Sequence, residues 1–124
     1  MSKEYGVELQ KLFLEMMCND AQSFVRLQNI YNPENFDRSV RAAAEFIKEH
    51  SNTYKVLPTL DQIKATSGIE LKAAKDLTES HNDWFMAEFE SFTKQYELER
   101  AILAAADMLE KGEYDPVEKL IKDA

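Results

Sequence analysis

The side chains that could carry chemistry are few in this sequence, and none has a partner at catalytic spacing. His50 and His81 each lie near the end of a predicted helix, and neither has a cysteine or carboxylate at metal-ligand spacing. Cys18 is the only cysteine, which excludes an internal disulfide and a multi-cysteine zinc site and is typical of a reducing compartment. We therefore expect no bound metal, and we interpret Cys18 as a small apolar residue buried on a helix.

Acidic side chains form two pairs within the longest predicted helix, Glu88/Glu90 and Glu97/Glu99. Residues two apart on a helix point to different faces, so neither pair can share a proton or flank a scissile bond. The sequence also lacks the G-x-x-x-x-G-K-[ST] loop that cradles nucleoside triphosphates and the G-x-S-x-G of hydrolases. It therefore predicts no catalytic residue and no cofactor, and we do not expect this chain to be an enzyme.

Negative charge is concentrated in the second half of the chain. The net charge is −8, of which residues 1–60 carry −1 and residues 61–124 carry −7. Such a surface repels phosphate and lacks the basic stripe that nucleic-acid-binding proteins use. We therefore expect no direct contact with nucleic acid. Two interpretations of the acidity stay open, namely solvated helix faces and a docking surface for a basic partner.

Length and hydropathy predict one cytoplasmic domain without a membrane anchor. A chain of 124 residues is long enough to bury a substantial core. The start, MSKEYGVELQ, has neither the basic region nor the apolar run of a signal peptide. Nor does any stretch approach the roughly 20 apolar residues that a membrane-spanning helix requires.

The apolar pattern predicts an all-α fold. Three glycines and three prolines provide few of the turns that β-hairpins need. Helical spacing favours helices over 4–17 and 24–30, and a third that starts at Phe36 and ends near EHSNTY, with a turn at Pro33 between the last two. Within 56–63, VLPTLDQI, Pro58 ends one helix and Thr59 begins the next.

Two signals define the helix that follows Pro58. Thr59 and Gln62 form a T-x-x-Q capping box, in which each side chain bonds the backbone amide of the other residue. Gly68 is placed to end this helix in a left-handed conformation. The pattern then predicts a fifth helix from Glu70, with its apolar positions at Leu71, Ala74 and Leu77.

The longest predicted helix spans Asp83 to Lys111, on the order of 43 Å at 1.5 Å per residue. One apolar stripe is expected to pack on the preceding bundle and consists of Phe85, Phe89, Phe92, Tyr96 and Leu103. A second stripe lies roughly 130° away, at about 100° per residue, and consists of Leu98, Ile102, Ala105 and Leu109.

The last residues are predicted to fold back as a helical hairpin. Gly112 ends the long helix, Asp115 caps a short one, Pro116 takes its first position and Glu118 completes the capping box. The predicted fold is thus a compact helical bundle, residues 1–82, continuous with a long helix and hairpin, residues 83–124. The short helix offers only three apolar residues, so the second stripe stays partly open. The candidate interface is Leu98, Ile102, Ala105, Leu109, Val117, Leu120 and Ile121.

The order of three segments resembles the N-terminal domain of DnaB-type replicative DNA helicases, most closely those of tailed phages. These segments are LQKLFLEMM, FVRLQNIYNPENFD and RAAAEFIKEHSNTYKVLPTLDQI. The remainder, NDWFMAEFESFTKQYELERAILAAADMLEKGEYDPVEKLIKDA, is similar to the helical hairpin that closes that domain. Phe13 stands about where bacterial members often have glycine, and YKVLPT replaces a glycine-containing turn, so the chain departs from the bacterial pattern.

The resemblance implies a function in DNA replication without catalysis by this chain. In that family the N-terminal domain forms a collar on a hexameric ring, pairs through its hairpins and receives primase or a helicase loader. A separate C-terminal motor hydrolyses ATP, and the resemblance implies that this chain is a fragment of such a helicase, in the host bacterial cytoplasm if phage-encoded. The alternative is a stand-alone acidic helical adaptor or loader-like interaction protein.

Overall fold

The structure, a computed structural model, describes residues 4–73 and 79–123 and confirms the predicted all-α class. No strand occurs within these ranges. The helices are α1 (Val7–Asn19), α2 (Ala21–Leu27), α3 (Arg38–Tyr54), α4 (Leu60–Ser67), α5 (Glu79–Glu110) and α6 (Tyr114–Asp123), with a 3₁₀ turn, η1 (Pro33–Asn35), before α3.

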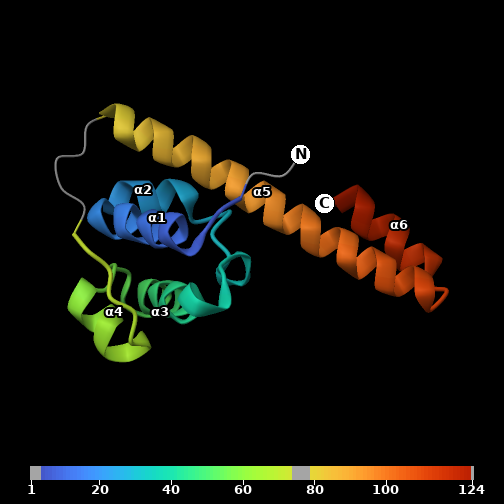
Figure 1. The fold of residues 1–124 in the computed structure, drawn as a ribbon, viewed down its shortest axis with the longest axis horizontal. Helices are drawn as coiled ribbons and strands as arrows, with labels where there is room; N and C mark the ends of the chain where they lie inside the picture. The colour runs from blue at the N-terminus through green and yellow to red at the C-terminus, as the bar shows by residue number, and fades with distance from the viewer. Residues whose placement is uncertain (1–3, 74–78, 124) are drawn as a thin grey trace.

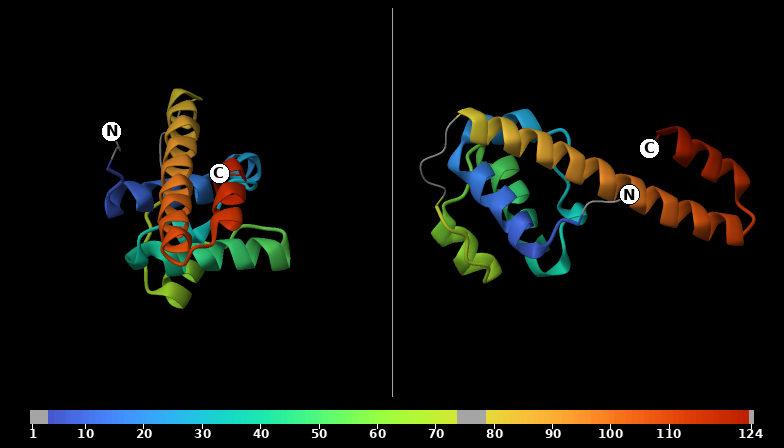
Figure 2. Two further views of the ribbon diagram at one scale, coloured as in Figure 1. Left: turned by 90° about the vertical axis from the view of Figure 1, so that its right-hand side faces the viewer. Right: turned by 45° about the horizontal axis from the view of Figure 1, so that its top comes forward.

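The helices form a head from which a two-helix hairpin extends (Figure 1). Helix α5 lies across α1 and α2, whereas α3 and α4 form the opposite side of the head. The C-terminal part of α5 continues beyond the head, and α6 runs back alongside it. The right-hand view of Figure 2 also shows that this hairpin stands clear of α3 and α4.

Aromatic side chains from distant parts of the sequence fill the core of the head. Phe13 of α1 lies against Phe89 of α5, with ring centroids 5.6 Å apart, and Phe36 lies 5.1 Å from Phe92. All four rings are fully buried or nearly so. Burying a phenylalanine side chain is worth about 1.5–3 kcal/mol, so these contacts hold the first half of α5 firmly on the head.

The predicted signals around Pro58 are confirmed. Thr59 Oγ1 accepts a hydrogen bond from the Gln62 amide at 3.1 Å, and the Thr59 amide donates to Gln62 Oε1 at 2.8 Å. Helix α4 therefore begins with a complete capping box. Gly68 ends the helix with φ at +76°, a left-handed conformation that glycine adopts without steric cost.

The predicted fifth helix does not begin at Glu70, because residues 68–73 are not helical. In this segment the Ile69 amide donates to Ser67 Oγ and the Lys72 amide donates to the Glu15 carboxylate of α1. Leu71 is nevertheless buried, as its apolar character predicted. The other expected apolar positions, Ala74 and Leu77, lie outside the described residues.

Two helix starts near the C-terminus also differ from the prediction. Helix α5 begins at Glu79, before the predicted Asp83, and Phe85, Phe89 and Phe92 in its first half are buried in the head. Helix α6 begins at Tyr114, which places Asp115 and Pro116 inside its first turn. Proline is tolerated there because first-turn amides have no partner within the helix.

Candidate protein interface

Helix α5 is anchored to the head over its first half by one apolar face. Phe85, Phe89 and Phe92 are fully buried, and Tyr96 lies partly buried beside them. The sequence placed Leu103 on the same face, but Leu103 is 70% exposed. The head ends before it, and the hydrogen bond from Arg100 to Glu34 of η1 lies at the edge of the head.

Arg100 marks the neck between head and hairpin. Its Nη1 donates to Glu34 of η1 at 2.8 Å, and its Nη2 lies 3.1 Å from Glu97. Glu97 Oε1 also accepts from the side-chain Nδ2 of Asn35 at 3.3 Å. The ion pairs of Arg100 involve exposed carboxylates and are individually weak, whereas Asn35 is buried.

The hairpin is closed by small and apolar side chains on facing sides of its two helices. Ala105 of α5 and Val117 of α6 are both buried, although both were candidates for an external interface. Gly112, with φ at +77°, ends α5, and the Glu113 amide donates to the Met108 carbonyl at 2.8 Å. This is a Schellman arrangement, which satisfies a free carbonyl at the helix end.

The other three residues of the second apolar stripe form the open face of the hairpin. Leu98 is 52% exposed, Ile102 59% and Leu109 50%, as the second apolar stripe predicted. Leu103 and Tyr114 add further exposed apolar surface. The side chains of Leu120 and Ile121, the remaining candidates, lie outside the described part of the structure. Large exposed aliphatic residues gathered on one helix are typical of a contact surface.

A groove of about 970 Å³ lies between the head and the second half of α5. Ile30, Leu98, Ala101 and Ala104 give it an apolar lining, and Thr93, Lys94, Glu97 and Arg100 add polar groups. The Thr93 hydroxyl is buried without a hydrogen-bond partner, as far as the structure describes the chain. The groove is continuous with the open face of the hairpin through Leu98, which belongs to both.

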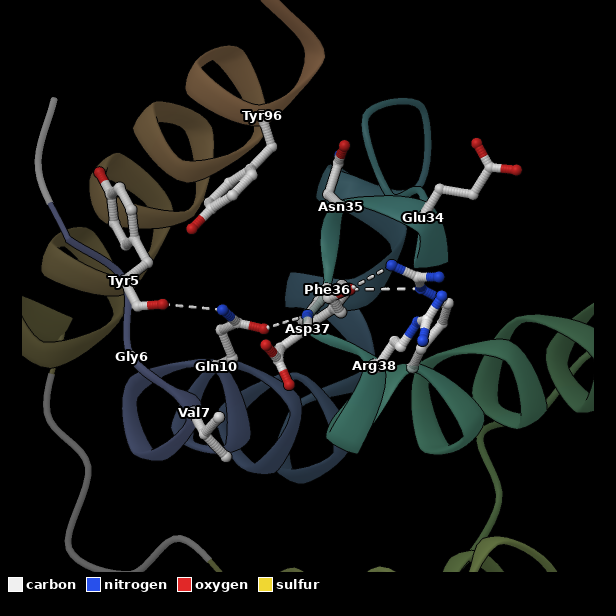
Figure 3. A pocket seen from close by; sticks show the side chains of 11 residues that line it. Tyr5, Gly6, Val7, Gln10, Glu34, Asn35, Phe36, Asp37, Arg38 and Tyr96 are labelled. Carbon is white, nitrogen blue, oxygen red and sulfur yellow. Dashed lines mark hydrogen bonds between the residues drawn. The ribbon is translucent and has the colours of Figure 1, made fainter. Parts of the chain in front are cut away.

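A smaller, polar cavity of about 430 Å³ lies on the head between α1, η1 and α5 (Figure 3). Two side chains beside it connect backbone segments. Gln10 bridges the Tyr5 carbonyl and the Asp37 amide, and Arg41 donates twice to the Phe36 carbonyl. Hydrogen bonds from Ser39 lower the pKa of the Asp37 carboxyl. The hydrogen bonds of Gln10 and Arg41 therefore connect separate backbone segments of the head.

Cys18 lies on a helix, α1, as the sequence predicted, and its side chain is partly buried. Burial, assisted by the nearby Glu15 carboxylate, raises the pKa of its thiol to about 12. A thiol in this state is a poor nucleophile because the thiolate is the reactive form.

Within residues 4–73 and 79–123, no group of three or more His, Cys, Asp or Glu side chains could hold a metal ion. No helix in the same part of the chain is long and apolar enough to cross a membrane.

Comparison with known protein families, curated proteins and solved structures returns no match. Within the described residues, the exposed apolar face of the hairpin is the candidate functional site.

Proposed function

We propose that this chain is the non-catalytic N-terminal domain of a DnaB-type replicative helicase. In this role it builds the collar of a hexameric ring through its hairpin and docks primase or a loader protein. The observation that supports the proposal is a helical head whose long helix continues into a hairpin with Leu98, Ile102 and Leu109 exposed. The domain would act in a bacterial cytoplasm, that of the host if a phage encodes it.

The resemblance and the hairpin support different parts of this proposal. The order of the segments that resemble the helicase domain points to the helicase family. The open face of α5 is the physical reason to expect assembly. Self-association would remove these aliphatic side chains from water, at roughly 25 cal/mol for each Å² buried.

The second candidate is a stand-alone acidic adaptor. It is favoured by the charge of −7 on residues 61–124, which suits a basic partner. An adaptor could use the same hairpin, so the fold alone does not separate the two functions.

The complete reading frame that encodes this chain separates them. We expect it to continue beyond Ala124 into a motor with a G-x-x-x-x-G-K-[ST] loop. The product should form a ring, hydrolyse ATP and separate DNA strands. The 124-residue chain alone should neither hydrolyse ATP nor separate DNA strands. A frame that stops at Ala124 would contradict the helicase proposal and leave the adaptor.

A further inference from the structure

Two arginines line the polar cavity of the head without an ion pair of their own. Arg38 and Arg41 lie three residues apart at the start of α3, so their side chains share one face of that helix. Within residues 4–73 and 79–123, neither guanidinium group lies within salt-bridge distance of a carboxylate. Like charges on adjacent turns of a helix repel each other, so this arrangement favours an anion that contacts both.

Hydrogen bonds hold the Arg41 guanidinium in place and leave part of it free. Its Nε and Nη2 donate to the Phe36 carbonyl at 3.3 and 3.0 Å. These bonds use two of the five N–H groups of a guanidinium, and the edge formed by Nη1 and Nη2 keeps the others. The planar fork of arginine matches two oxygens of a phosphate or a carboxylate. Arg41 is therefore oriented in advance for an oxyanion.

The acidic side chains that line the same cavity are engaged elsewhere. Glu34 pairs with Arg100 at 2.8 Å. Asp37 caps α3, because its carboxylate accepts from both the amide and the hydroxyl of Ser39. The two carboxylates therefore leave both cavity arginines without a direct partner.

The cavity has the size of a small-ligand site. Its volume is about 430 Å³, and small-molecule pockets span roughly 300–1,000 Å³. Figure 3 shows Tyr5 and Tyr96 on the side of the cavity away from Arg38. The centroids of these two rings lie 6.3 Å apart. A ligand whose charged group lies at Arg38 can thus direct a planar body towards the tyrosines.

We propose that this cavity binds a small phosphate monoester, whose phosphate is held by Arg38 and Arg41. Such a phosphate carries a charge of about −1.5 to −2 at pH 7, which two guanidinium groups balance. A carboxylate, with a single charge, balances one of them. The N-terminus of α3 also favours negative charge. The charge of −7 on residues 61–124 disfavours a long polyanion such as DNA, so a small ligand is the better match.

Titration of the wild-type chain with phenyl phosphate, followed by NMR of the backbone amides, tests the site. The amides of residues 36–41 should shift in a saturable manner. Inorganic phosphate should shift the same amides at higher concentration, because it has no ring to place beside the tyrosines. Benzoate has the same ring with a carboxylate and should bind about tenfold more weakly than phenyl phosphate. The absence of saturable shifts, or equal affinity for benzoate, would overturn the proposal.

Substitution of Arg38 tests the contact itself. Arg38 is exposed and has no side-chain partner in the described part of the chain, so Arg38→Gln should leave the fold intact. It should raise the Kd of phenyl phosphate about tenfold. Arg26→Gln is the matched control, since it makes the same change of charge on an exposed residue of α2 that does not line the cavity. Its Kd should stay within about twofold of wild type.

Three results with these variants and with DNA would overturn the proposal. An unchanged Kd in Arg38→Gln would mean that Arg38 does not touch the ligand. Equal weakening by Arg38→Gln and Arg26→Gln would mean that net charge alone explains the effect. Single-stranded DNA that displaces phenyl phosphate at lower concentration would assign the arginines to nucleic acid instead. The inference goes beyond the proposed function and does not depend on it, because the cavity lies on the head and the sedimentation of the hairpin is measured separately.

Discussion

Replacing Gln10 with leucine is expected to destabilise the head and loosen the anchor of α5. The Gln10 side chain is 3% exposed. Its Nε2 donates to the Tyr5 carbonyl at 2.8 Å, and its Oε1 accepts from the Asp37 amide at 2.7 Å. Tyr5 in turn packs on Phe92 of α5, with ring centroids 5.3 Å apart. Gln10 therefore joins the N-terminal segment, the start of α3 and, through Tyr5, the long helix.

Leucine fills a similar volume but leaves one backbone carbonyl and one backbone amide without partners. Each buried unsatisfied group costs about 1–3 kcal/mol. The adjacent polar cavity, which Gln10 lines, lets water recover part of this loss. We therefore expect Gln10→Leu to lower the free energy of unfolding by about 2–4 kcal/mol. At a urea dependence of about 2 kcal/mol per M, the midpoint of denaturation should fall by about 1–2 M.

Gln10→Glu provides a matched control with a defined pH dependence. A carboxylate can still accept from the Asp37 amide, but only the protonated form can donate to the Tyr5 carbonyl. Folding should therefore favour the neutral form and raise the folded pKa above the unfolded value of about 4.3. The stabilising contribution is present below pH 4.3 and lost as pH rises through the folded pKa.

Two results would refute this reasoning. The first is a Gln10→Leu protein whose free energy of unfolding lies within about 0.5 kcal/mol of wild type. The second is a Gln10→Glu protein whose stability relative to wild type does not change between pH 4 and pH 7. Either would mean that the bridge contributes little to the fold.

Two further predictions concern other parts of the head. Thr59→Ala removes the capping hydroxyl of α4 and should cost about 1 kcal/mol without changing the fold; an unchanged denaturation midpoint would contradict the capping assignment. Cys18 should react slowly with iodoacetamide at pH 8 in the folded chain and rapidly after unfolding, because burial raises its pKa. Equal rates in the two states would show that the folded thiol is accessible and ionisable.

The residues at which helices begin and end were predictable from the sequence where a residue type strongly prefers a helix terminus. The side chains of Thr59 and Gln62 each accept a hydrogen bond from the backbone amide of the other residue. Gly68 and Gly112 adopt the left-handed conformation that favours glycine. Lys55 shows the limit of such signals. It ends α3 with φ at +61°, although no glycine or asparagine marks the position in the sequence.

Long-range contacts account for the predictions that were wrong. Nothing local to Glu70 shows that the Lys72 amide will bond Glu15, which is far away in sequence. Leu103 shares the helical face of Phe92, but the sequence does not show where the head ends along α5. Ala105 fits the second apolar stripe by spacing, and the position of α6 reveals that it is buried.

Sedimentation of the wild-type chain and of Ile102→Glu tests the central claim most directly. Ile102 is 59% exposed, so a glutamate there should leave the fold intact, which circular dichroism would verify. We predict that wild type forms a concentration-dependent dimer and that Ile102→Glu is a folded monomer. A wild-type chain that sediments as a monomer at all accessible concentrations, or an Ile102→Glu chain that dimerises as tightly as wild type, would contradict an interface on this face of the hairpin.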